Sequence, residues 1–218
     1  RDRYMSEVLP RSAMVKVTLS DLKKKATAVY WSLWNQARSV GRDVKLYLHW
    51  TAGRYGQFWD DYHIQIDKAG EIYMPAGVNL DDILYGTWHR NTGSIAITLL
   101  GCFDATPNGL GSEPPTAAQI ETMSQVVCVL ANAFDLTIDK ARVMTHGEAG
   151  DNEDGVWCHE PYGPKSTVER WDLEFLGTPE SPVYDPYGKK GYRRGGDVIR
   201  GKANWYRKAG IKGVYDPR

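Results

Sequence analysis

Three things are scarce in this sequence: charge of one sign, long apolar runs and cysteine. Lys+Arg and Asp+Glu both number 27, so the formal net charge is zero. Proteins that hold nucleic acid through bulk charge are strongly basic, so we expect no nucleic-acid partner. No stretch approaches the run of about 18 apolar residues that crosses a bilayer, so we expect no membrane span. The odd, sparse set of cysteines excludes a disulfide framework and consists of Cys102, Cys128 and Cys158.

The spacing of apolar residues predicts alternating helices and strands in a chain of 218 residues, of which 42% are hydrophobic. Helices are expected at 18–41, 116–134, 166–176 and 197–208. Strands are expected at 44–51, 62–67, 71–74, 94–101 and 141–148, with a hairpin turn at 68–70. We therefore expect a single α/β domain in which helices flank a central mixed sheet.

We expect three parts along the chain. Residues 1–17 form an irregular lead-in, residues 18–176 form the main domain, and residues 177–218 form a basic extension rich in Tyr and Gly. Within the extension, residues 189–194 read KKGYRR, so basic side chains flank an aromatic one. A contact with an anionic polymer, a solvated tail and a strap over the domain all agree with this composition.

Two histidines stand at the ends of predicted strands. His49 ends the apolar run that begins at residue 44, and His146 ends the run that begins at residue 141. Histidine is the commonest metal ligand, so two imidazoles from separate strands indicate a metal site assembled by the fold. A catalytic zinc ion takes three protein ligands and keeps one position open. Composition does not choose the third ligand, for which the candidates are Asp154, Cys158, His159 and Asp172.

Six segments carry a family resemblance when they are taken in chain order. They are LHWTA (48–52), YHIQIDKAGEIY (62–73), NTGSIAI (91–97), the helix from Thr116, THGEA (145–149) and RWDL (170–173). This ordered set resembles the zinc-dependent N-acetylmuramoyl-L-alanine amidases of the type-2 group, which includes phage lysozymes of the T7 type and peptidoglycan-recognition proteins. The resemblance covers roughly residues 44–176.

The resemblance implies that Zn²⁺ is the cofactor, held by His49 and His146 at strand ends in a surface groove. Relatives take an Asp or a Cys beyond the second His as the third ligand, and a basic residue commonly precedes that ligand by two positions. Arg170 and Asp172 match this arrangement. The interval between His146 and Asp172 is longer than in many relatives, which keeps Cys158 as an alternative ligand.

The residue that transfers a proton differs from that of many relatives. Those relatives carry a Glu at the position where this sequence has Thr98. T7-type lysozymes instead use a Tyr beside the His of the second motif, and Tyr62 matches that position, although a packing role is open for it. Glu148 follows His146 by two residues, and such side chains share a face in a strand. We therefore expect Glu148 to act as a base or to orient a histidine. Arg170 stays protonated and is expected to stabilise the oxyanion.

These residues imply a zinc amidase that cleaves the amide bond between N-acetylmuramic acid and L-alanine in bacterial peptidoglycan, with the glycan strand and the stem peptide as partners. One alternative is a non-catalytic peptidoglycan-binding module on the same fold. A second is another zinc hydrolase, although the lack of an H-E-x-x-H pattern argues against the common metalloprotease layout.

We expect a monomer that acts on the bacterial cell wall. No signal peptide opens the sequence. We therefore expect either cytoplasmic synthesis with release by other means, as for a phage or prophage lysin, or a processed exported form.

Overall fold

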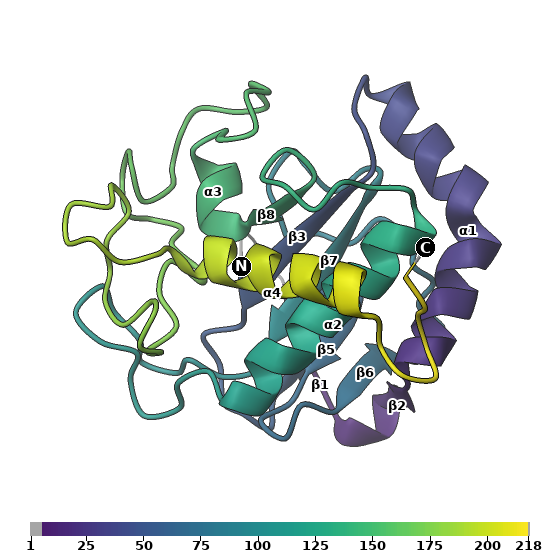
Figure 1. Ribbon diagram of the computed structural model, residues 1–218, viewed down its shortest axis with the longest axis horizontal. Coiled ribbons are helices and arrows are strands. Elements are labelled where there is room, and N and C mark those ends of the chain that lie inside the picture. The colour runs from purple at the N-terminus through teal and green to yellow at the C-terminus, as the bar shows by residue number, and fades with distance from the viewer. Residues whose placement is uncertain (1–5, 218) are drawn as a thin grey trace.

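A mixed sheet of six strands runs through the computed structural model, which describes residues 6–217 (Figure 1). The strand order is β2-β6-β5-β7-β3-β8, in which β5, β7, β3 and β8 run parallel while β6 and β2 are antiparallel to their neighbours. The bounds are β2 Met14–Val17, β3 Lys45–Trp50, β5 Ile64–Ile66, β6 Ile72–Pro75, β7 Ser94–Leu99 and β8 Val143–Thr145. Two short strands, β1 (Val8–Leu9) and β4 (Phe58–Trp59), pair separately. The predicted α/β class with a central mixed sheet is confirmed.

Three of the four helices begin close to the residues that the sequence indicates, whereas α3 begins inside the segment 141–148 that was predicted as one strand. They are α1 (Leu19–Ser39), α2 (Ala117–Ala133), α3 (His146–Gly150) and α4 (Gly195–Ala209), preceded by a 3-10 turn at Arg11–Ala13. Thr18 and Thr116 each accept a hydrogen bond from the backbone three residues on and form a capping box. The capping box satisfies backbone N–H groups that otherwise lack a partner in the first helical turn. The predicted starts of α1 and α2 are therefore confirmed.

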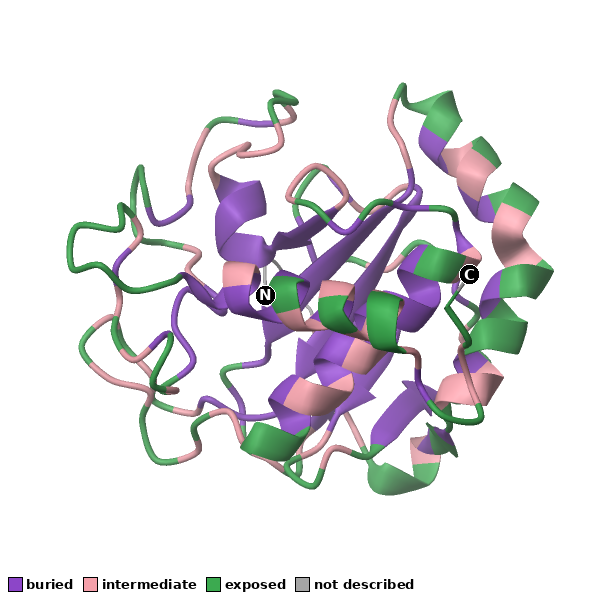
Figure 2. Cartoon of the chain, in the orientation of Figure 1, coloured by how far each residue is buried: buried purple, intermediate pink, exposed green. Residues whose placement is uncertain are grey.

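Strand alternation divides the side chains of β3 between the two faces of the sheet. Leu46 and Leu48 join the main core cluster, to which α1 and α2 contribute most of their buried residues. Tyr47 points to the opposite face, where it packs with Met144 and with Ala149 of α3. The strands are buried along most of their length (Figure 2). The long helices thus cover one face, α3 contacts the other, and polar residues of β3 and β7 on this second face, such as His49 and Thr98, are buried.

The C-terminal extension packs on the domain through α4. This helix lies across α2 (Figure 1), and its residues Val198, Ile199 and Ala203 join the main core cluster. The predicted helix at 197–208 is confirmed, with slightly wider bounds. Within residues 6–217 no helix is both long and apolar enough to span a membrane.

Two further local predictions are wrong. Part of the lead-in forms strands, because Met14 and Val17 are buried when β2 pairs with β6; residues 1–5 lie outside the described part of the chain. The segment 166–176 is not helical. Val168 and Leu173 have φ values of 65° and 62°, in the left-handed region that a right-handed helix cannot contain.

Candidate metal centre

The ends of two neighbouring parallel strands bring the histidines together. Leu48 of β3 pairs in register with Thr145 of β8. The next residue in each segment is a histidine, so His49 and His146 stand side by side where the strands end. Both side chains are fully buried, and their Nδ1 atoms lie 3.0 Å apart. Ligands in sheets with parallel strands gather at this carboxyl edge.

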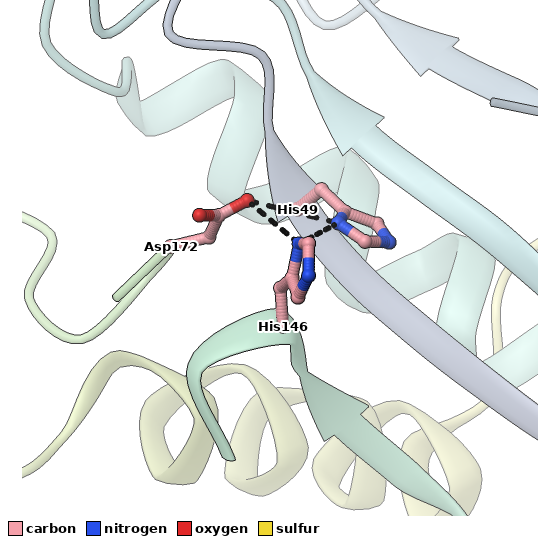
Figure 3. A group of neighbouring side chains, drawn as sticks. All are labelled: His49, His146 and Asp172. Carbon is pink, nitrogen blue, oxygen red and sulfur yellow. Dashed lines mark hydrogen bonds and ion pairs between the residues drawn. The ribbon is translucent and has the colours of Figure 1, made fainter. Parts of the chain in front are cut away.

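Asp172 completes a triangle with the two histidines (Figure 3). Its Oδ2 lies 3.6 Å from His49 Nδ1 and 3.5 Å from His146 Nδ1. Trp171, next to it, contacts Trp50 with ring centroids 5.3 Å apart, and Leu173 on its other side is buried in the core. Packing on both sides of Asp172 therefore holds its carboxylate toward the histidines.

The triangle fits a zinc ion. Ligand atoms of a tetrahedral zinc ion with bonds of about 2.0–2.1 Å lie roughly 3.3 Å apart, close to the separations in this triangle. Asp172 Oδ2 is buried, and among residues 6–217 it accepts no hydrogen bond. Two imidazole nitrogens and one carboxylate oxygen form a donor set that zinc uses in catalytic sites. His49, His146 and Asp172 would therefore hold the ion.

The electrostatics of the cluster favour the protonation states that bind a metal. Burial lowers the pKa of His49 to about 4, so its ring is neutral near pH 7. Burial alone would raise the pKa of Asp172, but the neighbouring His146 and His49 outweigh it and hold that pKa well below the usual range. Metal ligands must be a neutral imidazole and an ionised carboxylate.

A threonine that the sequence did not single out contacts the outer side of His49. Thr87 Oγ1 lies 3.2 Å from His49 Nε2, in an irregular loop that carries no recognisable motif. When Nε2–H donates to this hydroxyl, the Nδ1 lone pair of His49 remains for the metal. Such contacts fix the tautomer and orientation of a ligand.

The other candidates for the third ligand lie in different surroundings. In residues 6–217, the group of His, Cys, Asp and Glu side chains close enough to hold one ion consists of His49, His146 and Asp172. Cys158 Sγ is 3.6 Å from a guanidinium nitrogen of Arg42. The carboxylate of Asp154 pairs with Arg90 and Lys45, and the ring of His159 packs on Tyr162.

Of the predicted catalytic residues, Tyr62 lies beside the triangle and Arg170 lines a nearby cavity. The buried ring of Tyr62 lies 5.1 Å from the ring of His49. Arg170 lines a cavity of about 350 Å³ together with Trp88, Tyr162 and Glu169. The ring of Tyr162 is 6.4 Å from that of His146, and Trp88 follows the threonine that contacts His49. The cavity therefore adjoins the candidate metal site.

Glu148 has different surroundings from those expected. The strand ends at Thr145, and Glu148 lies in the first turn of α3, so the side chains at 146 and 148 do not share a strand face. Its carboxylate accepts hydrogen bonds from the backbone of Thr145 at 2.9 Å and from both Nη atoms of Arg200 at 2.7 and 2.8 Å. These bonds occupy both oxygens and favour a structural role.

The position where many relatives carry a glutamate is occupied by a hydroxyl. Thr98 is paired with His49 in the register of β7 and β3 and is fully buried. Its Oγ1 donates to the carbonyl of Leu99 at 3.2 Å. No carboxylate is therefore available from this strand position.

The fold and the donor set define an α/β protein with a zinc-type candidate metal centre at the carboxyl edge of its sheet. The family model for N-acetylmuramoyl-L-alanine amidase (Amidase_2) matches residues 27–161. The chain belongs to the N-acetylmuramoyl-L-alanine amidase family. The matched residues include His49, Tyr62 and His146, whereas Arg170 and Asp172 lie beyond them.

The solved structures that match part of this chain include endolysins and a recognition protein. The endolysin N-acetylmuramoyl-L-alanine amidase LysCS from Clostridium intestinale is 19% identical over 55% of this chain and 74% of its own, with a TM-score of 0.37. The Ph2119 endolysin of a Thermus scotoductus bacteriophage is 20% identical over 48% of this chain and 71% of its own, with a TM-score of 0.35. The Drosophila peptidoglycan recognition protein SD is 13% identical over 47% of this chain and 68% of its own, with a TM-score of 0.35. No curated protein matches the chain.

Proposed function

We propose that this protein is a zinc amidase that hydrolyses the bond between N-acetylmuramic acid and L-alanine in bacterial peptidoglycan, in the manner of an endolysin. One observation carries the proposal: His49, His146 and Asp172 meet with ligand atoms 3.0 to 3.6 Å apart in a chain of the amidase family. Hydrolysis breaks the C–N bond of the amide with one water molecule, so the lactyl group ends in a carboxylate and L-alanine departs with a free amino group.

The side chains around the triangle suit amide hydrolysis. Zinc, when bound, supplies a Lewis acid that polarises the scissile carbonyl and activates water. The guanidinium of Arg170 stays positively charged and lines the adjacent cavity, where it is suited to stabilise the oxyanion that forms. The hydroxyl of Tyr62 is the candidate for moving a proton between water and the leaving nitrogen.

The adjacent cavity suits the two parts of the substrate. The rings of Trp88 and Tyr162 offer apolar faces, and Glu169 and Arg170 offer charged groups for a peptide. Binding sites for small ligands combine apolar walls with a few polar groups that fix orientation. We assign this cavity to the substrate around the cleaved bond, with a sugar ring against the aromatic side chains.

The competing function is peptidoglycan binding without catalysis. It is favoured by one observation, the hydroxyl of Thr98 opposite His49 where many relatives carry a glutamate. Digestion of purified peptidoglycan separates the two functions. An amidase releases intact stem peptides with new L-alanine amino groups, and a chelator abolishes the release. A binding module sediments with the wall and releases nothing, and a peptidase leaves part of the peptide on the sugar.

A further inference from the structure

Two of the three candidate ligands are followed, two residues later, by a buried glutamate. Glu148 follows His146, and Glu174 follows Asp172; each glutamate is 1% exposed. A buried carboxylate is costly unless a cation and hydrogen bonds compensate it. The compensating cations both come from the C-terminal extension and lie outside the residues matched by the family model.

Arg200 of α4 holds the segment that carries His146. Its two Nη atoms donate to the two carboxylate oxygens of Glu148 at 2.7 and 2.8 Å, and Nη1 also donates to the carbonyl of Val143 at 2.9 Å. The contacted residues lie on both sides of His146, one in β8 and one in α3. Arg200 is 6% exposed, so one buried guanidinium fixes the strand end and the helix start together.

Arg194, the residue just before α4, holds the segment that carries Asp172. Its Nε and Nη2 donate to the carboxylate of Glu174 at 2.7 and 2.5 Å. Its Nη1 and Nη2 also donate to the carboxylate of Glu153 at 2.7 and 2.9 Å, just beyond the C-terminal end of α3. Arg194 therefore links the Asp172 segment to the chain that follows His146.

We propose that Arg194 and Arg200 are positioning residues of the metal centre, which set the distance between His146 and Asp172 by clamping the glutamate that follows each ligand. The inference rests on the proposed zinc site. The planar fork of arginine meets a carboxylate through two parallel hydrogen bonds, which lysine cannot reproduce. The extension thus completes the metal centre without supplying a ligand.

The test measures metal affinity in the full chain carrying Arg194→Lys or Arg200→Lys. The Zn²⁺ dissociation constant is determined by competition with a chromophoric chelator, below the melting temperature of each variant, and the Co²⁺ absorption spectrum reports ligand geometry. Loss of a group that orients a ligand costs about 10–100-fold in metal affinity, and we expect this loss in both variants together with a weaker Co²⁺ band. Arg193→Lys is the matched control, because Arg193 is the neighbouring, half-exposed arginine and pairs with Glu180 at 3.6 Å.

Wild-type affinity and an unchanged Co²⁺ spectrum in the folded lysine variants would overturn the positioning role, even if their melting temperatures fall. Glu174→Gln, which keeps the size of the side chain, replaces Arg194→Lys if that variant does not fold. Failure of the proposed amidase has a different signature, in which the wild type binds Zn²⁺ but releases no stem peptide.

Discussion

His49 Nδ1 faces His146 Nδ1 at 3.0 Å, at the ends of two parallel strands and in full burial. Burial lowers the pKa of His49 to about 4, so this ring does not carry a charge at neutral pH. A hydrogen bond between the two rings needs a proton on one Nδ1, and a cation bound to both nitrogens displaces that proton. Metal binding at this site should therefore release protons.

Arg170→Gln tests the proposed oxyanion contact. We expect activity on peptidoglycan to fall by about 10²–10³-fold, because one charged donor near the developing negative charge is lost. Zinc content should stay at the wild-type level, since Arg170 is not a ligand. Arg38→Gln, an exposed arginine on α1, is the control and should keep full activity. Equal activity of Arg170→Gln and wild type would remove Arg170 from the mechanism.

Tyr62→Phe removes one hydroxyl and leaves the buried ring in place. If this hydroxyl transfers a proton, activity should fall by about 10²–10⁴-fold with zinc content and melting temperature nearly unchanged. Tyr47→Phe is the matched control, because it removes another buried hydroxyl, one that accepts a hydrogen bond from Arg90 at 3.1 Å. That control should lower stability and keep activity. Unchanged activity in Tyr62→Phe would assign Tyr62 to packing alone.

Asp154→Asn should lower the free energy of unfolding at pH 7 and make that free energy depend less on pH in the acid range. Burial would raise the pKa of Asp154, but Arg90 and Lys45 outweigh it and hold the pKa at about 2. A carboxylate whose pKa falls on folding stabilises the native state above its unfolded pKa of about 4, and this contribution is lost as the pH falls through about 2. The substitution leaves two buried cations without their anion and should cost about 3 kcal/mol at pH 7.

Urea unfolding of this variant between pH 7 and pH 2 is the measurement. Glu71→Gln is the control, because that glutamate forms an exposed ion pair with Lys16 and should leave the curve unchanged. If the free energy of unfolding of Asp154→Asn varied with pH as in the wild type, the buried ion pairs of Asp154 with Arg90 and Lys45 would not stabilise the fold.

Gly93→Ala should destabilise the contact between α1 and the start of β7. Gly93 has a φ of 76°, and a Cβ atom there would lie 2.4–2.7 Å from atoms of Ala37 in α1. Gly77→Ala is the matched control, with a φ of 78° and open space around the added carbon. The control isolates the backbone strain, about 1–2 kcal/mol. Thermal melting should show a clearly larger loss for Gly93→Ala, and equal losses would contradict the packing at this helix.

The histidines were predictable because apolar periodicity locates a strand and the residue that ends it. The ends of the predicted strands were enough to pick out His49 and His146, because the carboxyl ends of neighbouring parallel strands lie at the same edge of the sheet. Asp172 was different, because it lies in a turn without periodicity and only the family resemblance placed it among the ligands. The surroundings of Thr87 and the pairs made by Arg194 and Arg200 depend on contacts between distant segments, which no local pattern encodes.

The expectation for Glu148 shows a local signal that was overlooked. Thr145 and Glu148 form the S/T-x-x-E pattern of a capping box, which marks the start of a helix. Reading residues 141–148 as one strand gave Glu148 the wrong neighbours. The lead-in was misjudged for another reason: β2 has four residues, too few for its alternation to stand out before its partner β6 is known.

Zinc content and peptidoglycan digestion, measured together for wild type, Asp172→Ala and Cys158→Ser, test the central claim most directly. We expect wild type and Cys158→Ser to hold one zinc ion per chain and to release intact stem peptides. Asp172→Ala should lose both zinc and activity while the chain stays folded, because its carboxylate closes the triangle with His49 and His146. Full zinc content in Asp172→Ala, or full activity of the wild type after complete removal of metal, would contradict the account.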